Sequence, residues 1–274
     1  HPNFFSYLPL SHIAERIGLE IHCLFYGGTL TFAESLDTFA VNLEACQPDL
    51  FFGVPRIYAK FKEKILENIS QKKLNFILSI PFLNQFFKRK LRSKLGLGNT
   101  NYIFSGAAPL SVDLMYWYKK IGIEILQGYG MTEDCIVSHG NIVGHNKIGT
   151  VGKFTSGATA KLSDIGEICV KNNCLMLGYY KNKEATDEIF DKDGYLKTGD
   201  IGEYDHDGYL IITGRAKDQF KTDKGKYISP APIELKLLEN TDIEQVCIVG
   251  MGIPQPIMLV IPSELGKRKT KIEL

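Results

Sequence analysis

The stretch IEILQGYGMTE, residues 123–133, decides the fold. Its first five residues form a short apolar run that predicts a buried β-strand, and the glycines on both sides of Tyr129 predict that this strand ends in a loop. The loop then offers a phenol ring, the Thr132 hydroxyl and the Glu133 carboxylate within a few residues. Open α/β sheets bind their ligands beyond the carboxyl ends of the strands, so we expect a functional site here.

Short apolar runs alternate with helical patterns upstream of this stretch. Strands are predicted at 49–54 and 101–105. Helices are predicted at 37–46, with Asp37 as the N-cap, from Ile57 onward, where apolar residues recur at every fourth position, and after Ser111, which can cap its helix. The alternation predicts an α/β fold with a mainly parallel sheet layered with helices.

A hairpin-rich β region is predicted downstream. Its strand candidates are 167–170, 195–197 and 209–213, separated by the turn sequences DKDG at 191–194 and DHDG at 205–208. Asp-Gly turns between apolar runs favour antiparallel pairing, so this region is expected to form a β subdomain of its own.

The composition is that of an ordinary globular protein. The 274 residues carry 32 basic and 31 acidic side chains, a net charge of +1, and 44% of them are hydrophobic. This balance excludes collagen, coiled coils and wholesale disorder, and it gives no overall electrostatic case for nucleic acid. The longest nearly apolar stretch, 74–83, is shorter than the roughly 20 residues that span a bilayer. Six cysteines without a CxxC pair predict reduced thiols in a cytoplasmic protein.

Three further segments combine glycine with hydroxyl or charged residues just after predicted strands. They are SGAAPL at 105–110, TGD at 198–200 and TGRAKDQFK at 213–221. Each by itself is explained equally well as turn chemistry. The TGD carboxylate could also accept both hydroxyls of a ribose, and the small residues of SGAAPL would let the backbone lie against a flat ligand.

In this order and spacing GYGMTE, TGD and GRAKD resemble the adenylate-forming acyl-CoA synthetases, specifically the long-chain fatty acid CoA ligases. The resemblance covers nearly the whole chain. Five more segments contribute to it: LPLSHIAER at 8–16, VPRIY at 54–58, GEICVK at 166–171, LGYYKN at 177–182 and GKYISPAPIE at 225–234.

The resemblance implies two half-reactions. The carboxylate of a fatty acid first attacks the α-phosphorus of ATP to give an acyl adenylate and pyrophosphate, and the CoA thiolate then attacks the acyl carbonyl and releases AMP. ATP and Mg²⁺ are the implied cofactors, with CoA as cosubstrate. The implied division is 1–148 as part of a large N-terminal domain with the acyl and adenine pockets, 149–214 as its β-rich subdomain, and 215–274 as a hinge and an incomplete α+β C-terminal lid.

The same resemblance assigns roles to the nucleotide-binding residues. Tyr129 is expected to flank the adenine, Thr132 to contact the α-phosphate, and Glu133 to hold Mg²⁺. Asp200 and Arg215 are expected to grip the ribose. Thr132 and Glu133 thereby count as catalytic residues.

Other positions carry over in the same way. Gly106 and Ala107 would form the wall between the adenine and acyl pockets, and Gly128 and Gly130 would line the nucleotide loop, with Gly130 also facing the substrate. His12 matches the position near the substrate carboxylate, although a capping or core histidine is nearly as well supported.

Two lysines are implied in the second half-reaction. Lys217 falls at the family's hinge, and Lys221 falls on the strand that faces the active site when the thioester forms, where it would count as catalytic. Both could equally be solvated surface charges, which is the usual state of lysine.

Two family elements have no match in the chain. The phosphate-cradling Ser/Thr/Gly-rich loop lies upstream of 8–16 in the family, and the catalytic lysine lies beyond the segment that matches 246–262. The segment FTSGATAK at 154–161 resembles the phosphate loop only superficially. We therefore expect this chain alone to be catalytically impaired. Two alternatives stay open: a noncatalytic nucleotide- or acyl-binding module, and an adenylating enzyme that loads a carrier protein.

One segment is strongly basic. Residues 56–94 hold eleven basic and two acidic side chains, interleaved with Phe and Leu. Such a surface is attracted to anionic lipid headgroups, so peripheral contact with the inner surface of the membrane is one interpretation. A solvated helix face is the other, which the sequence favours somewhat, and no nucleic-acid-binding module accompanies the charge.

Overall fold

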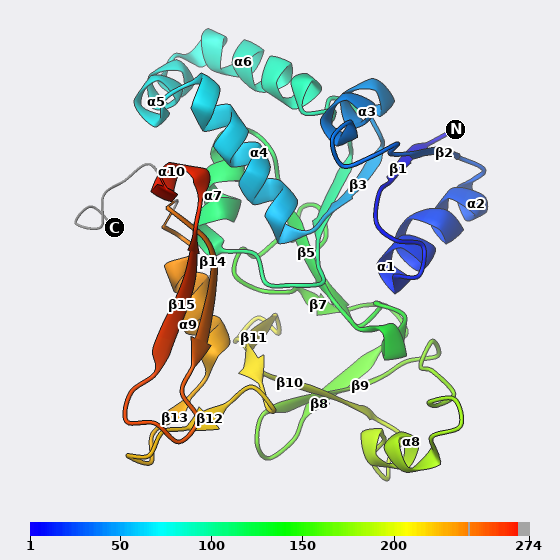
Figure 1. Cartoon of the computed structure of the whole chain (residues 1–274). Coiled ribbons are helices and arrows are strands. Elements are labelled where there is room, and N and C mark those ends of the chain that lie inside the picture. Colours follow the sequence, from blue (N-terminus) through cyan, green and yellow to red (C-terminus); the bar gives the residue numbers. More distant parts are fainter. Residues whose placement is uncertain (241, 268–274) are drawn as a thin grey trace.

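A computed structural model of the chain describes residues 1–240 and 242–267. Its main sheet holds seven strands in the order β2-β1-β3-β4-β5-β6-β7 (Figure 1). The strands are β1 (Asn3–Ser6), β2 (Thr29–Phe32), β3 (Leu50–Gly53), β4 (Tyr102–Ser105), β5 (Leu126–Tyr129), β6 (His139–Gly140) and β7 (Lys153–Phe154). Pairing is parallel from β2 through β5 and antiparallel from β5 through β7. The mainly parallel α/β sheet is therefore confirmed.

The helices that accompany this sheet begin where the sequence supplies caps. Pro55 and Pro81 stand in the first turn of their helices, where a missing backbone N–H costs nothing, and the Ser70 and Ser111 side chains accept from backbone N–H groups of theirs. The helices are α1 (Ile13–Glu15), a π-helical turn (Arg16–Ile21), α2 (His22–Tyr26), α3 (Phe39–Cys46), α4 (Pro55–Asn68), α5 (Gln71–Ser79), α6 (Pro81–Lys94) and α7 (Val112–Lys120).

The main core lies between the sheet and the helices α4 and α7. Its aromatic side chains are buried, and their polar atoms are satisfied: the Tyr58 hydroxyl donates to the Phe104 carbonyl and the Tyr118 hydroxyl to the Tyr58 carbonyl, both at 2.7 Å. The Phe51 ring meets the Tyr58 ring edge-on with centroids 6.2 Å apart. This packing fixes the carboxyl ends of β3, β4 and β5 side by side.

A second sheet holds four strands in the order β11-β10-β9-β8, all antiparallel. Asp191, in the turn that leads into β10, and Asp205, in the turn between β10 and β11, act in the same way, because each Oδ1 accepts from the backbone N–H groups two and four residues later. The predicted hairpin-rich region is thus confirmed. Its elements are β8 (Thr159–Leu162), β9 (Glu167–Lys171), α8 (Lys183–Ile189), β10 (Leu196–Tyr204) and β11 (Leu210–Arg215).

The C-terminal elements run along one side of the molecule, from the β12–β13 pair to the end of the long β14–β15 hairpin (Figure 1). They are β12 (Phe220–Lys221), β13 (Tyr227–Ile228), α9 (Pro230–Leu237), β14 (Ile243–Val249), β15 (Ile257–Pro262) and α10 (Glu264–Lys267). Of the segment predicted as hinge and lid, residues 241 and 268–274 lie outside the described residues. The three domain boundaries stay predictions.

Several element boundaries differ from the sequence-based expectation. The helix expected from Asp37 begins at Phe39, because the Thr38 and Ser35 side chains bond to each other and shape the preceding turn. The strand expected at 123–127 begins at Leu126, which is where pairing with β4 starts. No described helix has the length and apolar character that crossing a bilayer requires.

A larger difference concerns the segment TGD. It was expected after a strand, but it lies inside β10, where the register shifts between Lys197 and Ile201. Gly199 has φ of 74° and forms the bulge, and its backbone N–H donates to Glu167 Oε1 at 3.0 Å. The strand predicted at 195–197 therefore continues to Tyr204, and the sequence pattern hid this continuation because a bulge interrupts the alternation of apolar and polar residues.

Candidate nucleotide site

Three predicted site residues that are distant in the sequence meet at one carboxylate. The Tyr129 hydroxyl donates to Asp200 Oδ2 at 2.7 Å, and Arg215 Nε donates to Asp200 Oδ1 at 3.0 Å. The Asp200 side chain is 16% exposed and the Arg215 side chain 56% exposed, so the guanidinium reaches solvent while the carboxylate sits beneath it. Each carboxylate oxygen keeps a further lone pair for a ligand.

The bulge in β10 fixes the direction of this carboxylate. Asp200 pairs with Arg215 across the β10–β11 ladder, which accounts for their ion pair. The buried Thr198 hydroxyl donates to the Ile168 carbonyl at 2.8 Å and accepts from the Asp200 N–H at 3.1 Å. Two strands and one buried hydroxyl therefore hold Asp200 before any ligand binds.

Tyr129 joins the two sheets. It ends β5 of the main sheet, and its ring packs against the apolar core of the second sheet. Burial first, and the neighbouring Asp200 charge second, raise the pKa of Tyr129 well above its usual value. The phenol therefore stays protonated at physiological pH and acts as a hydrogen-bond donor to Asp200.

The loop after Tyr129 is tied by one buried carboxylate. Asp134 Oδ1 accepts from the N–H groups of Met131 and Ile136, at 2.8 and 2.9 Å, and burial raises the pKa of Asp134 to about 6. A side chain at Gly130 would place its Cβ 2.4 Å from the Ile136 Cα, so this tight turn admits only glycine. The turn brings Thr132 and Glu133 into a short 3₁₀ helix (Thr132–Asp134).

Thr132 is exposed and Glu133 is half-buried beside the 177–182 segment. Glu133 Oε1 accepts from the Tyr179 hydroxyl at 2.8 Å, and the Glu133 carbonyl accepts from the Met176 N–H at 2.8 Å. Its other carboxylate oxygen has no partner among the described residues. The described part of the chain holds no group of three or more side chains that could enclose a metal ion. A single carboxylate with free coordination capacity suits Mg²⁺, which commonly binds one or two carboxylates together with substrate phosphates.

Gly106 and Gly128 lie where β4 and β5 end, next to this loop. At Gly106 a Cβ would lie 3.3 Å from the Phe52 ring and 3.4 Å from the Gly128 carbonyl, so β4 and β5 approach closely there. The exposed Ala107 has φ of 65°, a left-handed conformation that costs energy for alanine. This turn and the Tyr129 loop both follow carboxyl ends of neighbouring strands.

The remaining predicted residues lie apart from the Asp200 network. His12 is exposed and caps α1, accepting from the Ala14 N–H at 3.2 Å. Lys217 is exposed and follows β11, and Lys221 is an exposed residue of β12 whose Nζ lies 5.4 Å from the centre of the Tyr227 ring. None of the described contacts joins either lysine to Asp200 or Glu133.

The sequence reasoning missed three residues that position the site. Tyr179 bonds Glu133, Thr198 holds the Asp200 backbone, and Asp134 ties the loop. The segments containing Tyr179 and Thr198 were singled out without roles for these side chains. Asp134 gave no signal, because its partners are backbone groups of its own loop.

Residues 1–180 match the family described as AMP-binding enzyme. The chain belongs to this family. The AMP-binding match includes β5 and the loop with Tyr129, Thr132 and Glu133, while Asp200 and Arg215 lie beyond the matched residues.

Curated relatives extend the likeness to most of the chain. The chain is 31% identical to fatty acyl-CoA synthetase B of Dictyostelium discoideum, covering 94% of this chain and 43% of that protein. It is 33% identical to a long-chain-fatty-acid–CoA ligase of Rattus norvegicus, covering 87% of this chain and 41% of that protein. The chain therefore spans less than half the length of these relatives.

Solved structures confirm the adenylate-forming fold. The A-PCP didomain of carboxylic acid reductase from Segniliparus rugosus, solved in complex with AMP, has a TM-score of 0.75 at 25% identity over 96% of this chain and 38% of its own. The O-succinylbenzoate CoA synthetase of Bacillus subtilis, also in complex with AMP, has a TM-score of 0.73 at 22% identity over 96% of this chain and 51% of its own.

Proposed function

We propose that the protein activates a long-chain fatty acid with ATP, as an acyl adenylate, and transfers the acyl group to CoA. The observation that carries the proposal is the Tyr129–Asp200–Arg215 network in a chain of the AMP-binding family. The substrate class rests on the relatives, which are named as fatty acyl-CoA synthetases and ligases.

The network is suited to a ribose. The Asp200 carboxylate can accept from both ribose hydroxyls while Tyr129 and Arg215 keep it in place from the other side. Bonds from hydroxyls to a carboxylate are charge-assisted and are therefore stronger than bonds between neutral groups. Tyr129 would flank the adenine, with Gly128 and the Gly106–Ala107 turn as the adjoining wall toward the acyl pocket.

The loop after Tyr129 is suited to phosphate and to a cation. The exposed Thr132 hydroxyl would contact the α-phosphate, and Glu133, oriented by Tyr179, would hold Mg²⁺. When bound, Mg²⁺ would neutralise charge on the polyphosphate during carboxylate attack. Gly130, whose position has no room for a side chain, keeps the backbone next to the reacting groups bare.

The substrate and the second half-reaction involve the residues outside the network. His12 would lie near the fatty acid carboxylate, with one ring nitrogen occupied by its cap bond. Lys217 would act as the hinge for the change between half-reactions, and Lys221 would face the site when CoA attacks. Both lysines are exposed.

The test uses the full-length protein that contains this chain. Fatty acids of graded length are supplied with ATP and Mg²⁺, with and without CoA, and AMP release and acyl-CoA are measured. We expect AMP release to depend on CoA and to rise with acyl length. Acyl transfer only to a carrier protein would overturn the assignment of CoA as the acyl acceptor. Nucleotide binding without pyrophosphate release would show that the protein is a noncatalytic binding module.

We also propose that residues 56–94 make a peripheral contact with an anionic membrane. The support is the local excess of basic residues together with exposed aromatic side chains in the same segment.

A further inference from the structure

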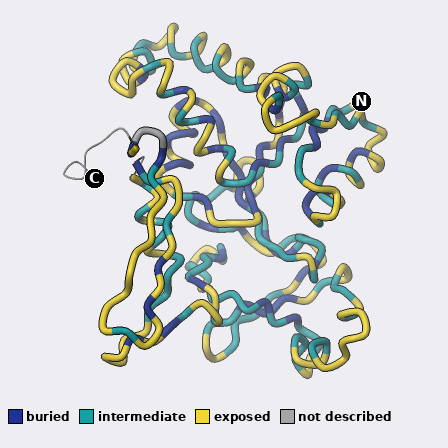
Figure 2. Tube along the Cα trace, in the orientation of Figure 1, coloured by how far each residue is buried: buried dark blue, intermediate teal, exposed yellow. Residues whose placement is uncertain are grey.

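All the charged side chains on the hairpin of α5 and α6 are basic. Residues 71–94 contain seven basic side chains and no acidic one. Figure 1 shows the two helices at one end of the molecule, and Figure 2 shows that their outer sides are exposed. The nucleotide residues lie on β5, β10 and β11, elsewhere in the molecule (Figure 1).

Large apolar side chains stand on this basic hairpin. On α6, Phe82 is 92% exposed and Phe86 is 65% exposed. They are four residues apart and so lie on one face of the helix, with Arg89 and Lys90 on the following turn of that face. The opposite face packs inward through Phe87 and other apolar side chains.

The same pattern occurs on α5. Phe76 is 66% exposed and follows the exposed pair Lys72 and Lys73 by four and three residues, so all three share a helix face. Leu74 on the inner face is buried. Both helices therefore present aromatic rings and cations together to solvent.

Two of the four basic residues of α4, which shares the basic segment, have partners within the protein. Arg56 of α4 forms an ion pair with Glu244 at 2.7 Å, and Lys62 lies 5.7 Å from the centre of the Trp117 ring, where burial lowers its pKa. In contrast, none of the basic side chains of residues 71–94 has a salt-bridge partner among the described residues. The charges of α5 and α6 are thus available to an external partner.

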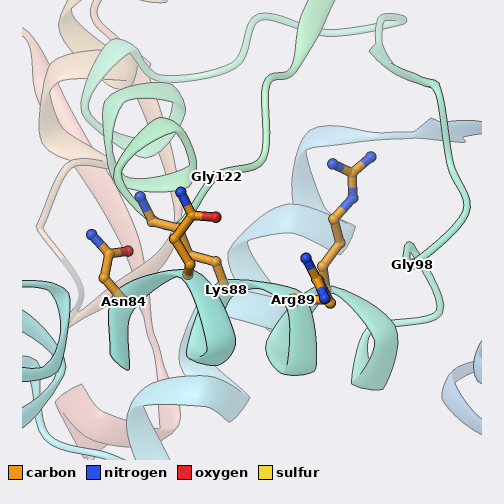
Figure 3. A pocket seen from close by; sticks show the side chains of 7 residues that line it. Asn84, Lys88, Arg89, Gly98 and Gly122 are labelled. Atoms are coloured by element: carbon orange, nitrogen blue, oxygen red, sulfur yellow. The ribbon is translucent and has the colours of Figure 1, made fainter. Parts of the chain in front are cut away.

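A hollow of about 410 Å³ adjoins the exposed face of α6 (Figure 3). Lys88 and Arg89 line it on the helix side, and Gly122 and Gly98 border it. Its lining also includes Asn84, Gln85 and Arg92. The Arg92 guanidinium donates to the carbonyls of Leu97 and Thr100, which fixes its positive charge beside the hollow. Such a site suits a phosphate group.

We propose that the α5–α6 hairpin docks on an anionic phospholipid bilayer. Phe76, Phe82 and Phe86 enter the boundary between headgroups and acyl chains, the surrounding lysines and Arg89 bind headgroup phosphates, and the hollow beside Lys88 seats one of them. Helices with Lys and Arg around exposed Phe lie in a bilayer interface in this way. Nucleic acid is the less favoured partner, because no recognised nucleic-acid-binding module accompanies these charges in the sequence.

This inference deepens the proposed membrane contact and requires neither ATP nor fatty acid. The chain is mixed with vesicles of phosphatidylcholine alone or with 30% phosphatidylglycerol, and bound protein is measured by flotation. We expect binding to the anionic vesicles only, and its loss in 0.5 M NaCl. Lys72→Gln with Lys73→Gln should lower the partition coefficient roughly 25-fold, about fivefold or 1 kcal/mol per charge. Phe82→Ser with Phe86→Ser should lower it at least about tenfold.

Two matched controls lie elsewhere in the chain. Phe25 is 81% exposed on α2, in a stretch without basic neighbours, so Phe25→Ser should leave vesicle binding unchanged. Lys224 and Lys226 are exposed between β12 and β13, at the opposite end of the molecule from α6 (Figure 1), so Lys224→Gln with Lys226→Gln should do the same.

Three outcomes would overturn the proposal. The first is equal loss of binding in the hairpin variants and the control variants. The second is binding to a single-stranded oligonucleotide, abolished by the hairpin variants, with no vesicle binding. The third is release from vesicles by millimolar glycerol 3-phosphate, which would show that a soluble phosphate is the ligand. Nucleotide binding by the same samples is measured separately, so failure here leaves the adenylate proposal standing.

Discussion

Replacing Asp200 by asparagine separates its role in binding a ribose from its role in the fold. The amide oxygen can still accept from the Tyr129 hydroxyl, so no buried donor is left unsatisfied. The ion pair with Arg215 is lost, but the Arg215 side chain is 56% exposed, and such pairs contribute about 1 kcal/mol or less. We therefore expect the free energy of unfolding of Asp200→Asn to lie within about 1 kcal/mol of that of the unchanged protein.

Nucleotide binding should change far more. Hydrogen bonds to a charged group contribute about 1.5 to 3 kcal/mol each. The loss of one such bond weakens AMP binding at least about tenfold, and the loss of both to the ribose weakens it on the order of a hundredfold.

The assay is calorimetric titration with AMP and with 2′,3′-dideoxy-AMP. The unchanged protein should bind the dideoxy nucleotide at least about tenfold more weakly than AMP, whereas Asp200→Asn should bind both within about threefold of each other. Asp207→Asn is the control, because Asp207 forms an exposed ion pair with Lys147 in the turn between β10 and β11. If Asp200→Asn discriminates the two nucleotides as well as the unchanged protein, Asp200 does not bind the ribose.

Three more predictions concern the buried His139, the turn at Gly130 and the proposed hinge residue Lys217. Burial lowers the pKa of His139 to about 4, whereas the pKa of histidine in the unfolded chain is about 6.5. As the pH falls, the unfolded chain therefore binds the proton first, and the free energy of unfolding decreases between pH 6.5 and pH 4 by at most about 3 kcal/mol. Urea unfolding at several pH values should show that the free energy of unfolding of His139→Gln, which loses the hydrogen bonds of the ring to Ser138 and Tyr204, falls less steeply with pH. An unchanged pH dependence would exclude His139 as the cause. Gly130→Ala should destabilise the chain by about 1 to 3 kcal/mol and weaken AMP binding, because its Cβ meets backbone, whereas Gly140→Ala, with no atom within 4 Å, should do neither. In the full-length protein Lys217→Pro should abolish acyl-CoA formation while pyrophosphate release is better preserved, and an equal fall in both would argue against a hinge.

Local sequence was sufficient for the inner strands of the parallel sheet, whereas β1 and β2 were not predicted. Apolar runs bounded by prolines, serines and glycines marked β3, β4, α4 and α7, because capping and burial of a strand act over a few residues. The Asp-Gly turns of the second sheet were predictable for the same reason. The bulge in β10 was not, since it results from pairing with β9 and β11.

The sequence by itself determined the kind of chemistry, because a tyrosine, a threonine, a glutamate and an aspartate in a family-specific order suffice to indicate a nucleotide. Only the tertiary structure decided which of them meet. Tyr129 and Asp200 are joined because β5 ends against the core of the second sheet, and Arg215 joins them through strand pairing. Packing likewise decided that Arg56 and Lys62 of α4 find partners within the protein. It also decided that Lys72, Lys73 and Lys90 of α5 and α6 stay exposed. Contacts between segments that are distant along the chain depend on the whole fold, which no local pattern encodes.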